Sequence, residues 1–152
     1  MTDAPLKTQI HEQMTTAMKA KDKVEVGTLR MLTSAIRYKE DELGHELSDD
    51  EVRDVAAKEV KKRAESIEAF EGAGRHELAE KERAEREAIA SYAPEPMTDD
   101  ELDALLDEAF AATGATSQKE FGAVMGFLMG KAKGRVDGKV AQEKVRARLS
   151  AS

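Results

Sequence analysis

The chain has 152 residues, of which 40% are hydrophobic, 36% are charged and only 4% are aromatic. A core built mainly from aliphatic side chains suits helices packed on helices, and segments rich in Ala, Glu, Lys and Arg are typical of long solvated helices. There is no cysteine, which excludes a disulfide scaffold, a thiol nucleophile and any cysteine-ligated metal site.

The formal net charge of −7 is spread unevenly along the chain. Residues 93–118 carry seven acidic residues and no basic one, whereas residues 119–152 carry eight basic and three acidic residues. So acidic a chain argues against general polyanion binding, and we expect no DNA partner. A basic terminal block can nevertheless mark a local anionic partner.

The start of the chain, residues 1–5, lacks the basic and apolar segments of a signal peptide. The longest stretch of low charge, residues 121–130, is too short to span a bilayer. We therefore expect a cytoplasmic protein without a membrane partner.

Apolar residues recur at helical spacing along the whole chain, and no segment alternates as a strand would. We expect an all-α fold in which capping boxes begin helices at Ser48, Thr98 and Ser117. Gly44 and Gly114 are the expected ends of two others. The predicted helices cover about 5–20, 23–43, 48–72, 75–92, 98–113, 117–134 and 139–149.

The clearest linker is Pro94-Glu95-Pro96, because proline disfavours helix at its own position and at the one before it. The sequence therefore predicts a multi-helical N-terminal domain of about four helices at residues 1–93. After it, the sequence predicts a linker at 94–96 and a smaller three-helix C-terminal domain at 97–152.

The sequence offers no recognisable catalytic or metal-binding constellation. The acid clusters at 49–51 and 99–101 occupy first turns of helices, where the helix dipole stabilises carboxylates. A capping role is therefore favoured over metal binding or acid–base catalysis. The basic run 61–63 has glutamates on both sides, which favours a solvated face over an RNA contact. Three histidines lie on separate segments, at His11, His45 and His76. We expect no catalytic residue, no metal and no cofactor.

Glycines recur every four residues at Gly122, Gly126 and Gly130, inside one predicted helix, and again at Gly134. Glycine weakens a helix interior by about 1 kcal/mol relative to alanine, so the pattern needs a reason. One is close packing against another helix; the other is close approach of a phosphate backbone, with lysines at both ends. Both interpretations stay open. The candidate RNA-binding set is Lys119, Gly122, Gly126, Gly130, Lys131, Lys133, Arg135 and Lys139.

Several segments resemble the YqeY domain of the GatB/YqeY family, in one order over nearly the whole chain. They are Leu29-Arg30-Met31-Leu32 with Ala35-Ile36, Lys58 to Arg63 with Ser66 to Phe70, Gly74-Arg75 with Leu78-Ala79-Glu80 and Glu82, Ser91-Tyr92-Ala93-Pro94, Gly122 to Gly126, and Lys131 to Gly138. A slight departure is Ala93, where the family more usually has leucine before the proline.

The resemblance implies a multi-helical N-terminal domain, a three-helix C-terminal domain and kinship with the tail of the GatB subunit of tRNA-dependent amidotransferases. That tail binds tRNA, while the carbon–nitrogen ligase chemistry, with glutamine as amido-N-donor, lies elsewhere in the enzyme. We therefore expect a non-catalytic tRNA-binding module, accessory to an amidotransferase or to other translation proteins. The alternatives are a protein–protein adaptor without nucleic acid and a subunit that acts in amide transfer.

Overall fold

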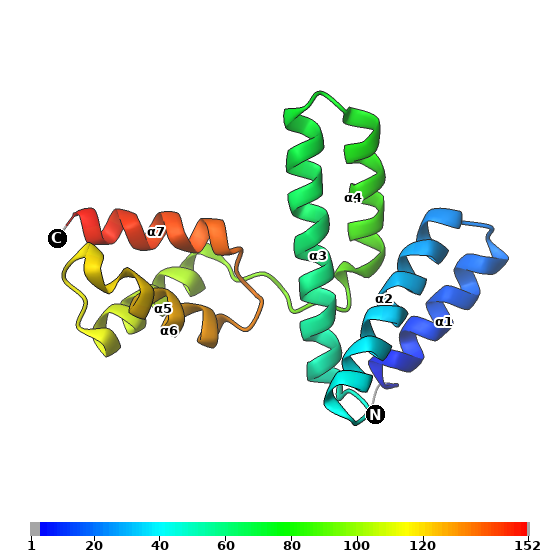
Figure 1. Ribbon diagram of the computed structural model, residues 1–152, viewed down its shortest axis with the longest axis horizontal. Coiled ribbons are helices and arrows are strands. Elements are labelled where there is room, and N and C mark those ends of the chain that lie inside the picture. The colour runs from blue at the N-terminus through cyan, green and yellow to red at the C-terminus, as the bar shows by residue number, and fades with distance from the viewer. Residues whose placement is uncertain (1–3, 152) are drawn as a thin grey trace. The chain divides into compact units, whose positions relative to one another are not determined.

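The computed structural model describes residues 4–151 and is helical throughout, with no strand in that range (Figure 1). Residues 1–3, part of the segment expected to lack a signal peptide, lie outside the described part. The elements in chain order are α1 (Leu6–Lys19), α2 (Lys23–Leu43), α3 (Asp49–Gly72), α4 (His76–Ala90), α5 (Asp99–Thr113), the 3-10 turn η1 (Gln118–Glu120), α6 (Phe121–Ala132) and α7 (Gly138–Ser150). The all-α prediction is confirmed.

Local side-chain chemistry sets most helix ends. Ser48 and Thr98 each accept a hydrogen bond from the backbone N–H three residues ahead, and the glutamate there reaches back, which confirms both capping boxes. Gly44 and Gly114 end α2 and α5 with φ of +77° and +64°, a left-handed conformation that glycine adopts without a steric penalty.

The third predicted capping box is wrong. No side-chain hydrogen bond caps the turn that follows Ser117, and a short 3-10 helix precedes α6. The Glu120 carboxylate instead accepts from the backbone N–H of Thr116 at 2.8 Å and from the Ser117 hydroxyl at 3.2 Å. The glutamate therefore orders the turn that leads into α6, and Lys119 lies on that turn rather than inside the helix.

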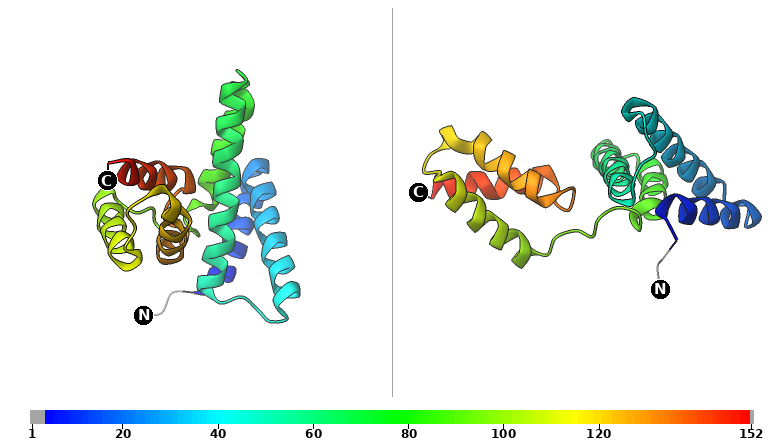
Figure 2. Two further views of the ribbon diagram at one scale, coloured as in Figure 1. Left: turned by 60° about the vertical axis from the view of Figure 1, so that its left-hand side comes forward. Right: turned by 90° about the horizontal axis from the view of Figure 1, so that it is seen from below.

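Contacts between residues divide the chain into two compact units, Met1–Pro94 and Glu95–Ser152, hereafter unit 1 and unit 2. In unit 1, α1 pairs with α2, and α3 and α4 form a long hairpin that also contacts α2 (Figures 1 and 2). The buried cluster of unit 1 is mainly aliphatic, with Leu29, Leu32 and Ile89 among its fully buried side chains. A second cluster joins α5, α6 and α7 around Leu106, Val124 and Leu128.

Tyr92, just beyond α4, connects the end of this hairpin to α1. Its hydroxyl donates to the side-chain oxygen of Gln13, whose amide nitrogen donates to Glu25 at 2.6 Å and to the carbonyl of Ala88 at 3.2 Å. Burial, and then the charge of Glu25, raise the pKa of Tyr92. These hydrogen bonds hold the chain against α1 directly before the proline segment 94–96.

The basic run 61–63 does not form a fully solvated face, and the prediction is wrong for Arg63. Lys61 and Lys62 are exposed, but Arg63 is only 4% exposed and pairs with Glu59 one turn earlier. Its Nε lies 3.8 Å from a carboxylate oxygen of Glu85 on α4. Burial and the neighbouring Glu85 carboxylate raise the pKa of Glu82 beside this cluster. The spacing of residues along α3 does not reveal the burial of Arg63, because α4 covers this side chain.

No helix between residues 4 and 151 combines the length and the apolar character that a bilayer crossing needs.

Replacing Arg63 with alanine should destabilise unit 1 by about 3–5 kcal/mol, because the buried Glu59 and the half-buried Glu85 would lose their buried cation. Chemical denaturation followed by circular dichroism measures this change. The matched control is Lys62→Ala, which removes an exposed partner 3.4 Å from Glu59 and should cost at most about 1 kcal/mol. Equal effects of the two substitutions would contradict the assigned role of Arg63.

We propose that units 1 and 2 are separate domains hinged at the proline segment. Limited proteolysis should then cut first at about residues 93–97 and release two helical fragments, since a linker is the most accessible backbone. Resistance there, with earlier cleavage inside either unit, would argue against the boundary.

Candidate nucleic-acid interface

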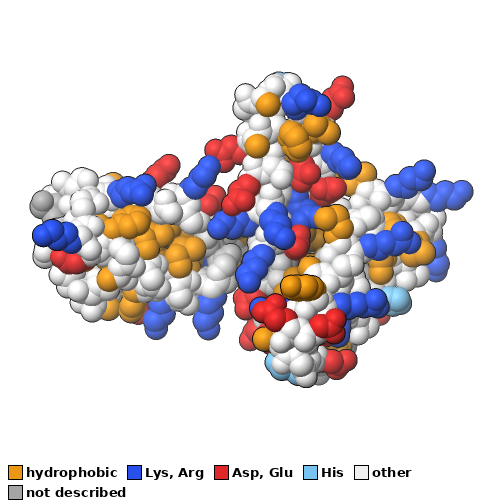
Figure 3. Space-filling view, in the orientation of Figure 1, with side chains coloured by type: hydrophobic (Ala, Val, Ile, Leu, Met, Phe, Trp, Pro, Cys, Tyr) orange, Lys and Arg blue, Asp and Glu red, His pale blue; other side chains and the backbone are white. Residues whose placement is uncertain are grey.

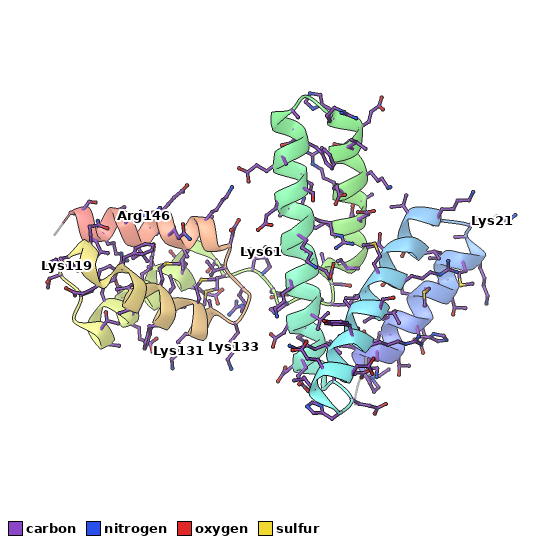
Figure 4. The ribbon with its side chains drawn as sticks, in the orientation of Figure 1. Lys21, Lys61, Lys119, Lys131, Lys133 and Arg146 are labelled. Carbon is purple, nitrogen blue, oxygen red and sulfur yellow. The ribbon has the colours of Figure 1, made fainter. Side chains whose placement is uncertain are left out.

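Seven of the eight residues predicted to contact RNA lie on α6 or on the turns that flank it, and Lys139 lies in the first turn of α7. Lys119 belongs to η1, and the three glycines and Lys131 belong to α6. Lys133 is the C-cap of α6, and Arg135 and Lys139 follow on the way into α7. Figure 4 shows Lys119 at one end of α6 and Lys131 and Lys133 at the other. The structure therefore brings the predicted residues together on α6 and around its two ends.

The glycine stripe is open to solvent. Gly122, Gly126 and Gly130 are all exposed, and a Cβ built at any of them would meet nothing within 4 Å. The buried side of α6 is formed by Val124, Leu128 and other apolar residues instead. No neighbouring helix of unit 2, as far as it is described, packs against the glycines. Of the two interpretations, close packing against another helix of the same unit is therefore excluded.

Three lysines around this stripe have no carboxylate partner among the described residues. Lys119, Lys131 and Lys133 are exposed, and Lys131 lies over the Phe127 ring with its Nζ 5.8 Å from the centroid. Lys133 adopts a left-handed conformation with φ of +48°. In Figure 3 two basic side chains project from the lower edge of unit 2, where Figure 4 labels Lys131 and Lys133.

Arg135 differs from these lysines because unit 2 already uses its guanidinium. It donates to a carboxylate oxygen of Glu101 and to the carbonyl of Glu95, both at 2.8 Å. Its own carbonyl accepts from the backbone N–H of Met97 at 2.9 Å. Arg135, followed by the capping hydrogen bonds of Thr98, lowers the pKa of Glu101. Arg135 therefore ties the turn after α6 to the start of α5.

The acidic helix α5 neutralises part of the basic block. Its carboxylates Asp103 and Asp107 pair with Lys144 and Arg148 of α7, at 3.6 Å and 2.6 Å. Unit 2 contains ten acidic and eight basic residues, so its total charge attracts no anion. Between Glu120 and Asp137, however, the chain has no acidic residue. The positive charge left over therefore belongs to α6 and its ends.

Two further basic residues lie on α7, next to α6. Lys139 is exposed at the start of α7, where its backbone N–H donates to Asp137 at 2.9 Å. Arg146 was not among the predicted contacts; it is exposed on α7, and its guanidinium carbon lies 4.9 Å from the centroid of Phe121 (Figure 4). Its position depends on how α7 packs against α6, which periodicity along one helix does not give.

Gly126→Ala should raise the stability of unit 2 by about 1 kcal/mol, because alanine is the better helix former and the added methyl group meets open space. Thermal unfolding should show a higher midpoint. The same substitution at Gly114, with its φ of +64°, should instead lower the midpoint through backbone strain. A lower midpoint for Gly126→Ala would show that the stripe is covered in solution.

Comparison with known proteins places the chain in a family. The family model described as Yqey-like protein matches residues 7–149. "Altered inheritance of mitochondria protein 41, mitochondrial" of Pyrenophora tritici-repentis is 28% identical over 140 residues, which cover 90% of this chain and 77% of that protein. "Uncharacterized protein C22F3.15" of Schizosaccharomyces pombe is 32% identical over 90 residues, which cover 59% and 73% of the two chains. The chain belongs to the YqeY-like family.

Proposed function

We propose that this protein is a non-catalytic tRNA-binding module, accessory to a tRNA-dependent amidotransferase or to other translation proteins. The observation that carries the proposal is the open glycine stripe of α6, which has exposed lysines without carboxylate partners at both of its ends. The proposal places the protein in the cytoplasm and gives it neither DNA nor a membrane as partner.

The chemistry of the stripe suits a phosphate backbone. Without side chains a helix surface allows a partner's backbone to approach closely, and glycine in a helix interior otherwise costs stability. Lys119, Lys131 and Lys133 are available to neutralise phosphates, which fix the orientation of a nucleic acid without reading its sequence. Aromatic side chains for stacking are few, so shape and phosphate contacts of a folded RNA fit better than base recognition.

The link to amide transfer comes from the family resemblance. The GatB tail, which this chain resembles, is a tRNA-binding part of an enzyme whose glutamine-dependent chemistry lies in other domains. The name carbon–nitrogen ligase would accordingly describe the whole amidotransferase and not a chain that corresponds to its tail. For the chain itself we propose no catalytic residue and no cofactor.

A protein–protein adaptor is the alternative, and one observation favours it. The exposed glycines are bordered by half-buried apolar side chains, among them Met125, Phe127 and Met129. Small residues spaced by four also let two helices approach closely, as in small-xxx-small contacts. A partner helix would then cover the stripe that the main proposal assigns to RNA.

The test is binding of bulk tRNA to the full chain, measured by fluorescence anisotropy at several salt concentrations. Affinity should fall steeply as salt rises, because each neutralised phosphate releases counterions. The triple variant Lys119→Glu, Lys131→Glu and Lys133→Glu should bind at least about tenfold more weakly, since each reversed charge repels phosphate. Arg135 is left unchanged because it holds Glu101.

The control is an equal reversal on unit 1, at the exposed Lys19, Lys58 and Lys61. It changes the net charge by the same amount and should lower the affinity far less. Equal losses in the two triple variants would show only non-specific attraction. If the wild type does not bind tRNA at low salt, the proposal fails, and RNA-independent binding of one protein to α6 would support the adaptor.

A further inference from the structure

The outer side of α2 carries a regular stripe of exposed residues. Val24, Met31 and Tyr38 follow one another at intervals of seven and are 38%, 55% and 73% exposed. Gly27 and Ser34 lie between them and are exposed as well. This alternation of three and four residues is the spacing of the seam between two helices of a coiled coil. We call these five residues the α2 stripe.

The α2 stripe alternates large and small side chains, which is what a second helix needs in order to interlock. A Cβ added at Gly27 would meet nothing within 4 Å, so large side chains of a partner have room there. Met31 is held in place because its sulfur accepts from the buried Arg63, with Nη2 at 3.6 Å. Both views of Figure 2 show α2 at the outer edge of unit 1.

A row of cations runs along one edge of the α2 stripe. Lys23, Arg30 and Arg37 each precede one of its large residues, and at about 100° per residue they line the side that faces away from the core of unit 1. All three side chains are exposed and form no hydrogen bond or ion pair with the described residues; the charge of Arg37 is a minor cause of the lowered pKa of Glu40. Their common spacing gives the apolar stripe a positive border, which argues for a partner with negative charge.

Acidic residues flank both ends of the α2 stripe, and at the far end the exposed Asp41 and Glu42 follow Tyr38. Beside Val24, a pocket of about 360 Å³ is lined by Asp22, Glu25 and Glu87, among other residues. A partner's carboxylates therefore fit on the cationic edge and not on the pocket side. A second copy of α2 fits poorly, because it would bring another row of cations close to the first.

We propose that the α2 stripe docks an amphipathic helix of a partner protein, with large apolar residues at heptad spacing and carboxylates along the edge that faces Lys23, Arg30 and Arg37. This interaction lies outside the proposed tRNA function, which uses unit 2. It would let the protein hold RNA and a protein partner on different units.

The test uses the full chain and a fluorescent helical peptide of the length of α2, with leucines at the two seam positions of each heptad and glutamates on the flanks. A second peptide has lysines in place of the glutamates. The acidic peptide should bind with saturable anisotropy and the basic one at least about tenfold more weakly, since like charges across an interface repel. Unlabelled acidic peptide should displace the signal.

Two variants of the chain locate the binding. The double variant Arg30→Glu and Arg37→Glu should weaken binding of the acidic peptide at least about tenfold. Its control, Lys58→Glu with Lys61→Glu on α3, changes the net charge equally and should have little effect. Gly27→Leu fills the open position between Val24 and Met31, so it should abolish binding while the thermal midpoint stays equal or rises.

Three results would overturn the proposal. The first is the absence of saturable binding of the acidic peptide up to about 1 mM, a concentration at which even weak association would be detected. The second is an equal loss of affinity in the test and control double variants. The third is binding of the acidic peptide to Gly27→Leu as tight as to the wild type. If Arg30→Glu with Arg37→Glu weakens tRNA binding but leaves peptide binding intact, the row of cations is a nucleic-acid contact instead.

Discussion

Pairing between the carboxylates of α5 and the cations around it decides where positive charge remains available in unit 2. Glu101 takes Arg135, Asp103 takes Lys144, and Asp107 takes Arg148. Exposed ion pairs of this kind contribute little stability, with a median of about 0–1 kcal/mol. Their larger effect is to distribute charge over the surface: they leave the acid-free segment around α6 as the uncompensated side of a unit whose total charge is slightly negative.

Unit 1 differs from unit 2 because it contains a buried ion-pair cluster. Arg63 lies between Glu59 and Glu85 where α3 and α4 pack, and it also reaches Met31 on α2. One buried cation thus relates three helices, including the helix whose outer side is left apolar and uncovered within the described chain. A buried ion pair of this kind fixes geometry more than it adds net stability, since desolvation offsets much of the attraction. Unit 1 therefore presents the outer side of a helix held in place by a buried ion pair. Unit 2 presents a surface around α6 whose positive charge is not neutralised.

The sequence predicted the helices well because their signals are local. The caps at Ser48 and Thr98 and the glycine ends at positions 44 and 114 depend on neighbours within a few residues, and all of them are confirmed. The misses depend on partners far along the chain. Burial of Arg63 needs α4, and the ion pair that occupies Arg135 joins residues separated by most of unit 2. Ser117 satisfies the capping pattern, but its hydroxyl donates to Glu120 and accepts no backbone N–H, and Glu120 accepts from the backbone N–H of Thr116. The glycine stripe was visible in the sequence, whereas its exposure required the structure.

Folded RNA is proposed to bind this protein on α6. Ultraviolet crosslinking in cells, with sequencing of the bound RNA and mass spectrometry of the crosslinked peptides, tests it most directly. We expect tRNA to dominate the recovered RNA and the crosslinks to fall in the segment from Lys119 to Lys139. Recovery of no RNA above background, recovery of RNA other than tRNA, or crosslinks in unit 1 would contradict binding of tRNA on α6.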